Sequence, residues 1–114
     1  YGDGTTRRDY TYLGDLVRGI RAALDYDADS YAVMNVGSGQ PVELNDIIDT
    51  LEDGLGQSLE RNHLPEQPGD VPQTWADISR AKNLIEYEPQ VDFQTGVERF
   101  VDHIDSAEET APAQ

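Results

Sequence analysis

The sequence predicts a small α/β unit of about four helices and a few short strands. Apolar residues recur at helical spacing in several stretches, and β-branched and aromatic residues gather in short runs between them. Glycines or prolines separate several of these segments. At 114 residues the chain is long enough for one domain with a modest core and too short for two. It contains no internal repeat and no dividing linker.

The first predicted elements are a strand, a helix and a second strand. Arg8–Tyr12 is rich in aromatic and β-branched residues, which favour strands. Asp15 is a suitable cap for a helix that ends near Leu24. Its apolar residues form one stripe: Leu16, Val17, Ile20, Ala23 and Leu24. Tyr31–Val36 then has the composition of a buried strand, and a glycine-containing turn ends it.

The middle of the chain predicts a second helix and another strand. Leu44–Leu55 has helical periodicity, and Gly56 follows at the position where a helix commonly ends in glycine. The apolar face of this helix consists of Leu44, Ile47, Ile48, Leu51 and Leu55. Ser58–Leu64 is expected to form another short strand.

Two further helices and a tail complete the prediction. Asp77 is expected to cap the third helix and Asp92 the fourth, with Pro89 separating them. The inward residues of the third helix are Ile78, Ala81, Leu84 and Ile85. The stripe of the fourth consists of Phe93, Val97, Phe100, Val101 and Ile104. Residues 106–114 have no apolar anchor, so we expect a folded portion over 1–105 and a disordered tail over 106–114.

The composition argues against several classes of function. With 23 acidic and 8 basic residues the net charge is -15, and such a chain should be repelled by nucleic acids and anionic membranes. No apolar run approaches the roughly 18 residues of a membrane span. The absence of cysteine fits a cytoplasmic protein. The acidic residues are interpreted as a solvated surface, and an acidic interaction module is the alternative.

The predicted strand Tyr31–Val36 has few possible partners within this chain. A strand of this hydrophobicity normally has neighbours on both edges and cover on both faces. The first residues carry neither the basic nor the apolar region of a signal peptide, so the chain is interpreted as the interior of a longer protein. We therefore expect part of it to dock onto a sheet outside this sequence, or to self-associate when isolated.

The segment Gln67–Asp77 is the most informative part of the chain. It contains two prolines, one glycine and two acidic residues around Trp75, without apolar periodicity. Such a segment is expected to be an ordered loop that leads into a helix, and loops on rigid scaffolds often carry function.

Together with Gly2-Asp3-Gly4 and Arg8-Asp9-Tyr10-Thr11-Tyr12, this loop resembles the C-terminal part of NAD-dependent nucleotide-sugar epimerases and dehydratases. These enzymes belong to the extended short-chain dehydrogenase/reductase family, and the resemblance is greatest to its UDP-glucuronate 4-epimerase branch. It extends from Tyr1 to about Ile104. It implies a small lobe that binds a UDP-sugar, with one strand that completes a Rossmann-type sheet.

The resemblance also implies NAD as cofactor, a 4-keto sugar intermediate, a homo-oligomer and a place in carbohydrate metabolism. In this family the glycine-rich phosphate loop and the catalytic tyrosine and lysine lie upstream of the matching region. No Gly-x-Gly-x-x-Gly occurs here, and Lys82 has no tyrosine at the required spacing. We therefore expect no catalytic residue in this chain, which alone should be inert. Dehydratase and decarboxylase relatives remain open alternatives.

Arg8 is the first candidate for substrate binding. A guanidinium can donate two parallel hydrogen bonds to a diphosphate. The family's Arg-Asp-Phe/Tyr motif places an arginine on the nucleotide phosphates, and Arg8 matches it. The alternative is an arginine paired with a surface acid. On a strand, Arg8 should share its face with Tyr10 and Tyr12, and Arg7 should point to the other. Asp9 is expected to brace the strand or a neighbouring loop.

Asp70 and Gln67 are the other substrate-binding candidates. In the matching family loop, the acid after the glycine lies near the nucleotide ribose, where a carboxylate accepts from hydroxyls. The alternative is a turn aspartate bonded to its own backbone. Gln67 stands where galactose-type epimerases tend to carry an arginine, so it is the weaker contact.

The remaining polar and aromatic candidates are interpreted as structural. Asp77 is expected to cap a helix, and Trp75 to fill the core. His63 and His103 are isolated in the sequence, so no metal site is expected. Two hypotheses remain: the UDP-sugar-binding lobe of an epimerase, and an acidic interaction module without enzymatic function.

Overall fold

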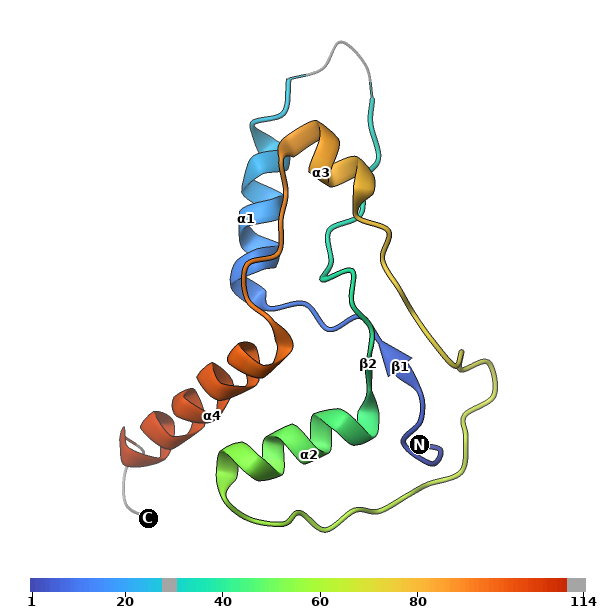
Figure 1. Cartoon of the computed structure of the whole chain (residues 1–114), viewed down its shortest axis with the longest axis vertical. Helices are drawn as coiled ribbons and strands as arrows, with labels where there is room; N and C mark the ends of the chain where they lie inside the picture. The colour runs from blue at the N-terminus through green and yellow to red at the C-terminus, as the bar shows by residue number, and fades with distance from the viewer. Residues whose placement is uncertain (28–30, 111–114) are drawn as a thin grey trace.

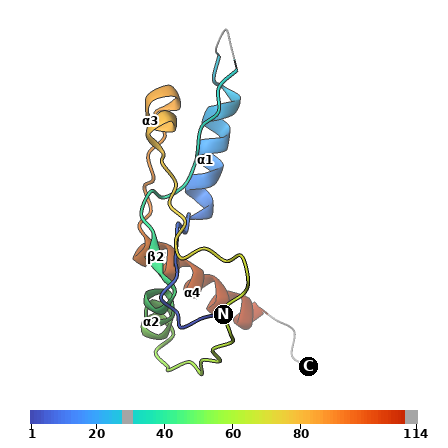
Figure 2. The ribbon, with the colours of Figure 1, turned by 90° about the vertical axis from the view of Figure 1, so that its right-hand side faces the viewer.

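The computed structural model describes residues 1–27 and 31–110 of the chain. Its elements are β1 (Arg7–Arg8), α1 (Leu13–Leu24), β2 (Val42–Glu43), α2 (Leu44–Leu55), α3 (Ser79–Ile85) and α4 (Phe93–Thr110). Helices α1 and α3 pack together at one end, α2 and α4 lie at the other, and the short sheet lies between them (Figure 1). Figure 2 shows the same division from the side. The predicted α/β class and its helices are confirmed.

The sheet consists of β1 and β2 in antiparallel pairing. Arg7 lies opposite Glu43, and Arg8 lies opposite Val42. The sheet continues into α2, whose first backbone N–H groups donate to carbonyls of the N-terminal loop. The Leu44 N–H donates to Thr6 at 3.0 Å, and the Asn45 N–H donates to Gly4 at 2.9 Å. The N-terminal loop, β1 and α2 therefore form one hydrogen-bonded unit.

Helix α2 and the start of α4 agree with the sequence pattern. Gly56 has φ 68°, in the left-handed region, and its N–H donates to the Glu52 carbonyl at 2.9 Å, as expected of a glycine C-cap. The Asp92 carboxylate accepts from the Thr95 N–H at 2.8 Å and caps α4. Hydrogen bonds from Thr95 lower the pKa of Asp92 below its ordinary value.

The prediction that Asp15 caps the first helix is wrong. Helix α1 begins at Leu13, and Asp15 lies in its first turn with only 1% of its surface exposed. Its carboxylate accepts from the Gln90 and Val91 N–H groups, each at 3.1 Å, and from the Arg18 guanidinium. Asp15 therefore fastens the connection between α3 and α4 to α1.

The third helix begins slightly later than expected and ends in an unusual conformation. The Asp77 carboxylate accepts from the Ser79 N–H at 3.0 Å and from the Ser79 hydroxyl at 2.5 Å. Asp77 thus supplies an acceptor for the first N–H of α3, although Ile78 occupies the N-cap position. Glu86, which ends α3, has φ 55° in the left-handed region. The Tyr87 N–H closes this end by donating to the Ala81 carbonyl at 3.2 Å.

A small core lies beside α3. It contains Ile78, Ala81 and Tyr87, and the partly buried side chains packed against them are Met34, Val36, Ala76 and Ile85. The Tyr87 hydroxyl donates to the Gly37 carbonyl at 2.6 Å. Burial and the negative charge of Asp9 raise the pKa of Tyr87. At Gly19 of α1, an added Cβ would lie 2.6 Å from a Val36 methyl group, so this close approach requires glycine.

Two of the predicted strands are not strands in the structure, and the first is shorter than predicted. The predicted strand Arg8–Tyr12 shares only Arg8 with the observed strand β1 (Arg7–Arg8). Within the described residues, Tyr31–Val36 and Ser58–Leu64 are irregular. A strand needs a hydrogen-bonding neighbour, and the described sheet has only two members. Tyr31–Val36 nevertheless alternates in burial. Met34 and Val36 pack against the core, whereas Tyr31 is 90% exposed.

Apolar side chains of α1 and of the Tyr31–Val36 segment, which approaches α1 where Val36 meets Gly19, are exposed. We call this set of residues the open face; its members, all more than half exposed, are Leu13, Val17, Ile20, Leu24, Tyr31 and Val33. It includes part of the predicted stripe of α1, which therefore does not pack into the described core. Leu84 was expected to point inward and Trp75 to fill the core, and these predictions are wrong: the side chains are 37% and 67% exposed. Phe100, in the predicted stripe of the fourth helix, is 54% exposed.

Helix α4 extends through Thr110 and so includes residues 106–110, which the sequence assigned to the tail. Alanine and glutamate in this stretch favour helix, and Pro112 comes later. The division between lobe and tail stays a prediction, and residues 111–114 lie outside the described part. Among the described helices, none has the length and apolar character needed to cross a membrane.

Candidate functional site

Arg8 and Asp70 meet although they lie 62 positions apart. A guanidinium nitrogen of Arg8 lies 2.6 Å from Asp70 Oδ1, within a salt bridge. The side chains are 27% and 41% exposed, so both remain accessible. The structure thus brings together the two residues that the sequence singled out for a nucleotide.

Hydrogen bonds between β1 and the proline-containing loop bring Arg8 and Asp70 together. The Arg7 N–H donates to the Pro72 carbonyl at 2.8 Å, and the Thr74 N–H donates to the Arg7 carbonyl at 3.1 Å. This is a parallel bridge between Arg7 and Gln73. The loop therefore runs beside β1 on the edge that β2 does not use, and carries Asp70 toward Arg8.

A tight turn presents Asp70. The Asp70 N–H donates to the Gln67 carbonyl at 3.1 Å, and Gly69 between them has φ 86°. With proline at the second position and a positive φ at the third, this is a type II turn, in which Gly69 adopts a conformation that strains other residues. The Asp70 carboxylate bonds to Arg8 rather than to its own backbone.

Gln67 contributes its backbone carbonyl to the turn, and its side chain is exposed. The structure therefore places all three candidates in one region: Arg8 on the strand edge, Asp70 against it, and Gln67 at the start of the turn. A ligand-binding role for each stays a prediction.

Asp9 holds this region together. Its carboxylate accepts from the Ser38 N–H at 2.8 Å, the Ser38 hydroxyl at 2.6 Å, the Gly39 N–H at 2.9 Å and the Ala76 N–H at 3.1 Å. Burial acts to raise the pKa of Asp9, but the hydrogen bonds from Ser38, Ala76 and Gly39 outweigh it, and the pKa is lowered. The expected bracing role is confirmed: Asp9 joins the end of β1 to two loops.

The two neighbouring arginines point to different partners, as the strand geometry predicts. Arg7 donates to the Pro41 carbonyl at 3.1 Å, whereas Arg8 faces Asp70 and also donates to the Arg7 carbonyl at 2.7 Å. The expectation that Tyr10 and Tyr12 share the face of Arg8 is wrong. Because the strand ends at Arg8, the Tyr10 ring lies 6.2 Å from that of Phe93 and Tyr12 lies under the guanidinium of Arg99.

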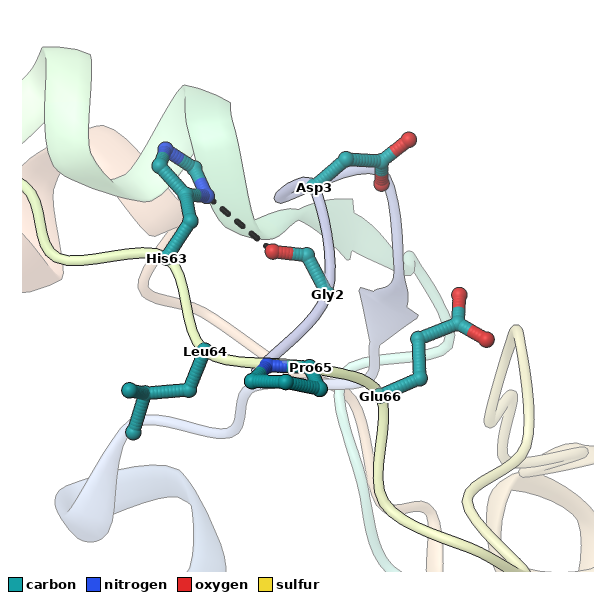
Figure 3. A pocket seen from close by; sticks show the side chains of 6 residues that line it. All are labelled: Gly2, Asp3, His63, Leu64, Pro65 and Glu66. Carbon is teal, nitrogen blue, oxygen red and sulfur yellow. Dashed lines mark hydrogen bonds between the residues drawn. The ribbon is translucent and has the colours of Figure 1, made fainter.

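The other aromatic and histidine candidates have partners other than Arg8 and Asp70. Trp75 donates through Nε1 to the Gly39 carbonyl at 2.8 Å. His63 lies in a surface hollow lined by Gly2, Asp3, His63, Leu64, Pro65 and Glu66. Its Nδ1 lies 3.0 Å from the Gly2 carbonyl, so that nitrogen carries the donated proton. The carboxylates of Asp3 and Glu66 point away from the ring (Figure 3).

Sequence reasoning missed the partners of Asp9. Ser38 and Gly39 follow the Tyr31–Val36 segment in a turn whose glycines predict only a bend. The hydrogen bonds to Asp9 depend on residues 29 and 30 positions apart, for which the sequence carries no local signal.

Comparisons with known proteins show which family the chain resembles. Residues 1–100 match the family described as GDP-mannose 4,6 dehydratase. The UDP-glucuronate 4-epimerase of Thermodesulfobacterium geofontis is 41% identical over 102 residues, which cover 89% of this chain and 31% of that protein.

Solved structures resemble the chain closely. The crystal structure of UDP-glucuronic acid 4-epimerase from Bacillus cereus, in complex with UDP-glucuronic acid and NAD, has 41% identity and a TM-score of 0.85, and the match covers 93% of this chain and 34% of that one. The UDP-glucose 4-epimerase of Thermotoga maritima, with UDP-glucose, has 29% identity and a TM-score of 0.85, over 95% of this chain and 34% of that one. The chain thus spans about a third of the length of these relatives. With a match over residues 1–100, the chain belongs to the GDP-mannose 4,6 dehydratase family.

Proposed function

We propose that the chain is the UDP-sugar-binding lobe of an NAD-dependent epimerase, with UDP-glucuronate as its substrate and a 4-keto sugar as the intermediate. The salt bridge of 2.6 Å between Arg8 and Asp70 carries the proposal, because it brings together a guanidinium that can donate to phosphates and a carboxylate that can accept from ribose hydroxyls. Relatives at 41% identity named UDP-glucuronate 4-epimerase support the choice of substrate.

The two side chains would divide the nucleotide between them. The guanidinium of Arg8 donates to diphosphate oxygens, and the carboxylate of Asp70 accepts from ribose hydroxyls. The type II turn and the ladder to β1 hold Asp70 in place before the ligand arrives. A fixed nucleotide leaves the sugar free to turn, and anchoring the non-reacting half of a substrate is an effective use of binding energy.

NAD does not fit the residues of this chain. A dinucleotide site of the Rossmann type needs a parallel strand, a glycine-rich turn and the N-terminus of a following helix. The only sheet in the described residues is the antiparallel pair β1 and β2, and the sequence has no Gly-x-Gly-x-x-Gly. The proposal therefore assigns the cofactor and the chemical step to other residues of the protein.

Gln67 supports the glucuronate branch, since it replaces a cation with a neutral amide at the start of the turn. The interaction-module alternative is not favoured, because it gives no reason for the match over residues 1–100.

The open face supports a further proposal about assembly. In isolation the chain would self-associate, because Leu24 and Tyr31 on that face are 81% and 90% exposed. A homo-oligomer of the full-length protein is proposed on the family resemblance alone.

Two measurements test the proposed function. The full-length protein, supplied with NAD, should convert UDP-glucuronate to UDP-galacturonate, and failure to change any UDP-sugar would contradict the proposal. Arg8→Ala should weaken UDP binding by about 1.5–3 kcal/mol, the usual contribution of a hydrogen bond to a charged group. Arg61→Ala is the matched control: Arg61 is also paired with carboxylates, of Asp49 and Glu52, but lies elsewhere. Equal UDP affinity in the two variants would mean that Arg8 is only an arginine paired with a surface acid.

A further inference from the structure

We propose that Asp70 is a specificity-determining residue that selects nucleotides over simple phosphate anions, by acting as an internal competitor for Arg8. The inference rests on the proposed function, in which Arg8 receives the diphosphate, and it adds a role that ribose contact alone does not imply. The observation behind it is that the two groups are bonded to one another.

The salt bridge occupies part of the donor set of Arg8. One terminal nitrogen is bonded to Asp70 Oδ1 at 2.6 Å, and the other donates to the Arg7 carbonyl at 2.7 Å. An anion that approaches this guanidinium must displace the carboxylate or share the guanidinium with it. In either case the anion lies beside a negative charge, in a chain whose net charge is already -15.

Backbone hydrogen bonds on both sides of Asp70 limit how far its carboxylate can move away from Arg8. The Gln67–Asp70 hydrogen bond fixes the residue on one side, and the bond from the Arg7 N–H to the Pro72 carbonyl fixes the chain on the other. A displaced Asp70 carboxylate therefore stays close to Arg8. For a bare phosphate or pyrophosphate, this repulsion remains uncompensated.

A nucleotide differs because it brings hydroxyl groups along with the phosphates. Ribose hydroxyls can donate to the displaced carboxylate and replace the hydrogen bond that it loses from Arg8. The same side chain thus opposes anions without ribose and accepts those with it. Both side chains are partly exposed, so the competition between Asp70 and an incoming anion for Arg8 is weak and reversible.

The test compares pyrophosphate with UDP in the full-length protein, by calorimetric titration at low salt. Asp70→Asn keeps the shape of the side chain and removes its charge. We expect it to strengthen pyrophosphate binding about 2- to 5-fold, the range that an exposed ion pair contributes. We expect UDP binding to weaken about 5-fold or more, because the charged acceptor for ribose is lost. The two ligands should therefore respond with opposite signs.

Asp49→Asn is the matched control. Asp49 is likewise an exposed aspartate in a salt bridge, 2.7 Å from Arg61, so the variant removes the same charge and the same kind of pair elsewhere. It should leave both affinities near those of the unmodified protein.

The outcomes separate the two proposals. If the unmodified protein binds no UDP, the proposed function fails. If UDP binds but Asp70→Asn does not strengthen pyrophosphate binding beyond Asp49→Asn, including the case of no pyrophosphate binding in either, the competitor role is overturned. Weakening of both ligands together would mean that Asp70 only supports the shape of the site.

Discussion

Replacing Asp9 with asparagine tests how the site is held together. The carboxylate accepts three backbone N–H groups and two hydroxyls: Oδ1 accepts from the Ser38 N–H and from the Ser38 and Thr11 hydroxyls, and Oδ2 accepts from the Gly39 and Ala76 N–H groups. An asparagine has one acceptor oxygen, so its amide nitrogen must face one of these two donor sets. The Ser38 and Thr11 hydroxyls can rotate, which makes the Oδ1 side the less costly place for the amide, but the Ser38 N–H is then left without an acceptor.

The magnitude follows from that count. One orphaned N–H costs about 1–3 kcal/mol, and the remaining bonds lose the benefit of an ionised acceptor. We therefore expect Asp9→Asn to lower the free energy of unfolding by about 2–3 kcal/mol. UDP affinity should also fall at temperatures where the variant is fully folded, because Asp9 holds the 74–76 segment against β1 and so sets the position of Arg8 relative to Asp70.

Asp15→Asn provides the comparison. Asp15 is another carboxylate that accepts two loop N–H groups, from Gln90 and Val91, but it is fully buried and acts between α1 and the α3–α4 connection. Urea unfolding should show a loss of stability in both variants, and UDP titration should show a loss of affinity in Asp9→Asn alone. Equal UDP affinity in the two would refute the reasoning, and so would an Asp9→Asn protein as stable as the unmodified one.

Three further predictions concern stability and assembly. Glu86→Gly should raise the free energy of unfolding by up to about 1 kcal/mol, because φ 55° is strained for a residue with a Cβ, whereas Glu86→Ala should give no gain in urea unfolding. The lowered pKa of Asp9 means that its contribution to stability is complete above its ordinary value of 3.8 and is lost as pH falls through the folded-state pKa, so an acid titration of unfolding should be flatter in Asp9→Asn. The isolated chain should self-associate through the open face, and light scattering should show oligomers that Leu24→Asp reduces; a strictly monomeric chain at high concentration would count against the proposal.

Local signals predicted the helices well. The bounds of α2 and the cap at Asp92 agree with the pattern because each depends on residues a few positions apart. Asp15 shows the limit of this reasoning. An acid before an apolar stripe has the same sequence signature whether it caps its own helix or, as here, bonds to a loop 75 positions away.

The strands were harder to predict because a strand depends on its neighbours. Tyr31–Val36 has the composition of a strand and alternates in burial, but it has no strand partner among the described residues. The left-handed conformation of Glu86 was not predicted either, because a helix that ends in this conformation usually has glycine at that position. Arg8 and Asp70 were found through the family resemblance. Nothing local to either residue indicates that they meet.

A crystal structure of the full-length protein with UDP tests the central claim most directly. We expect the Arg8 guanidinium to contact the diphosphate, the Asp70 carboxylate to contact the ribose, and the bond between the two side chains to be broken or shared. A nucleotide bound elsewhere, with Arg8 and Asp70 still paired only with each other, would contradict it.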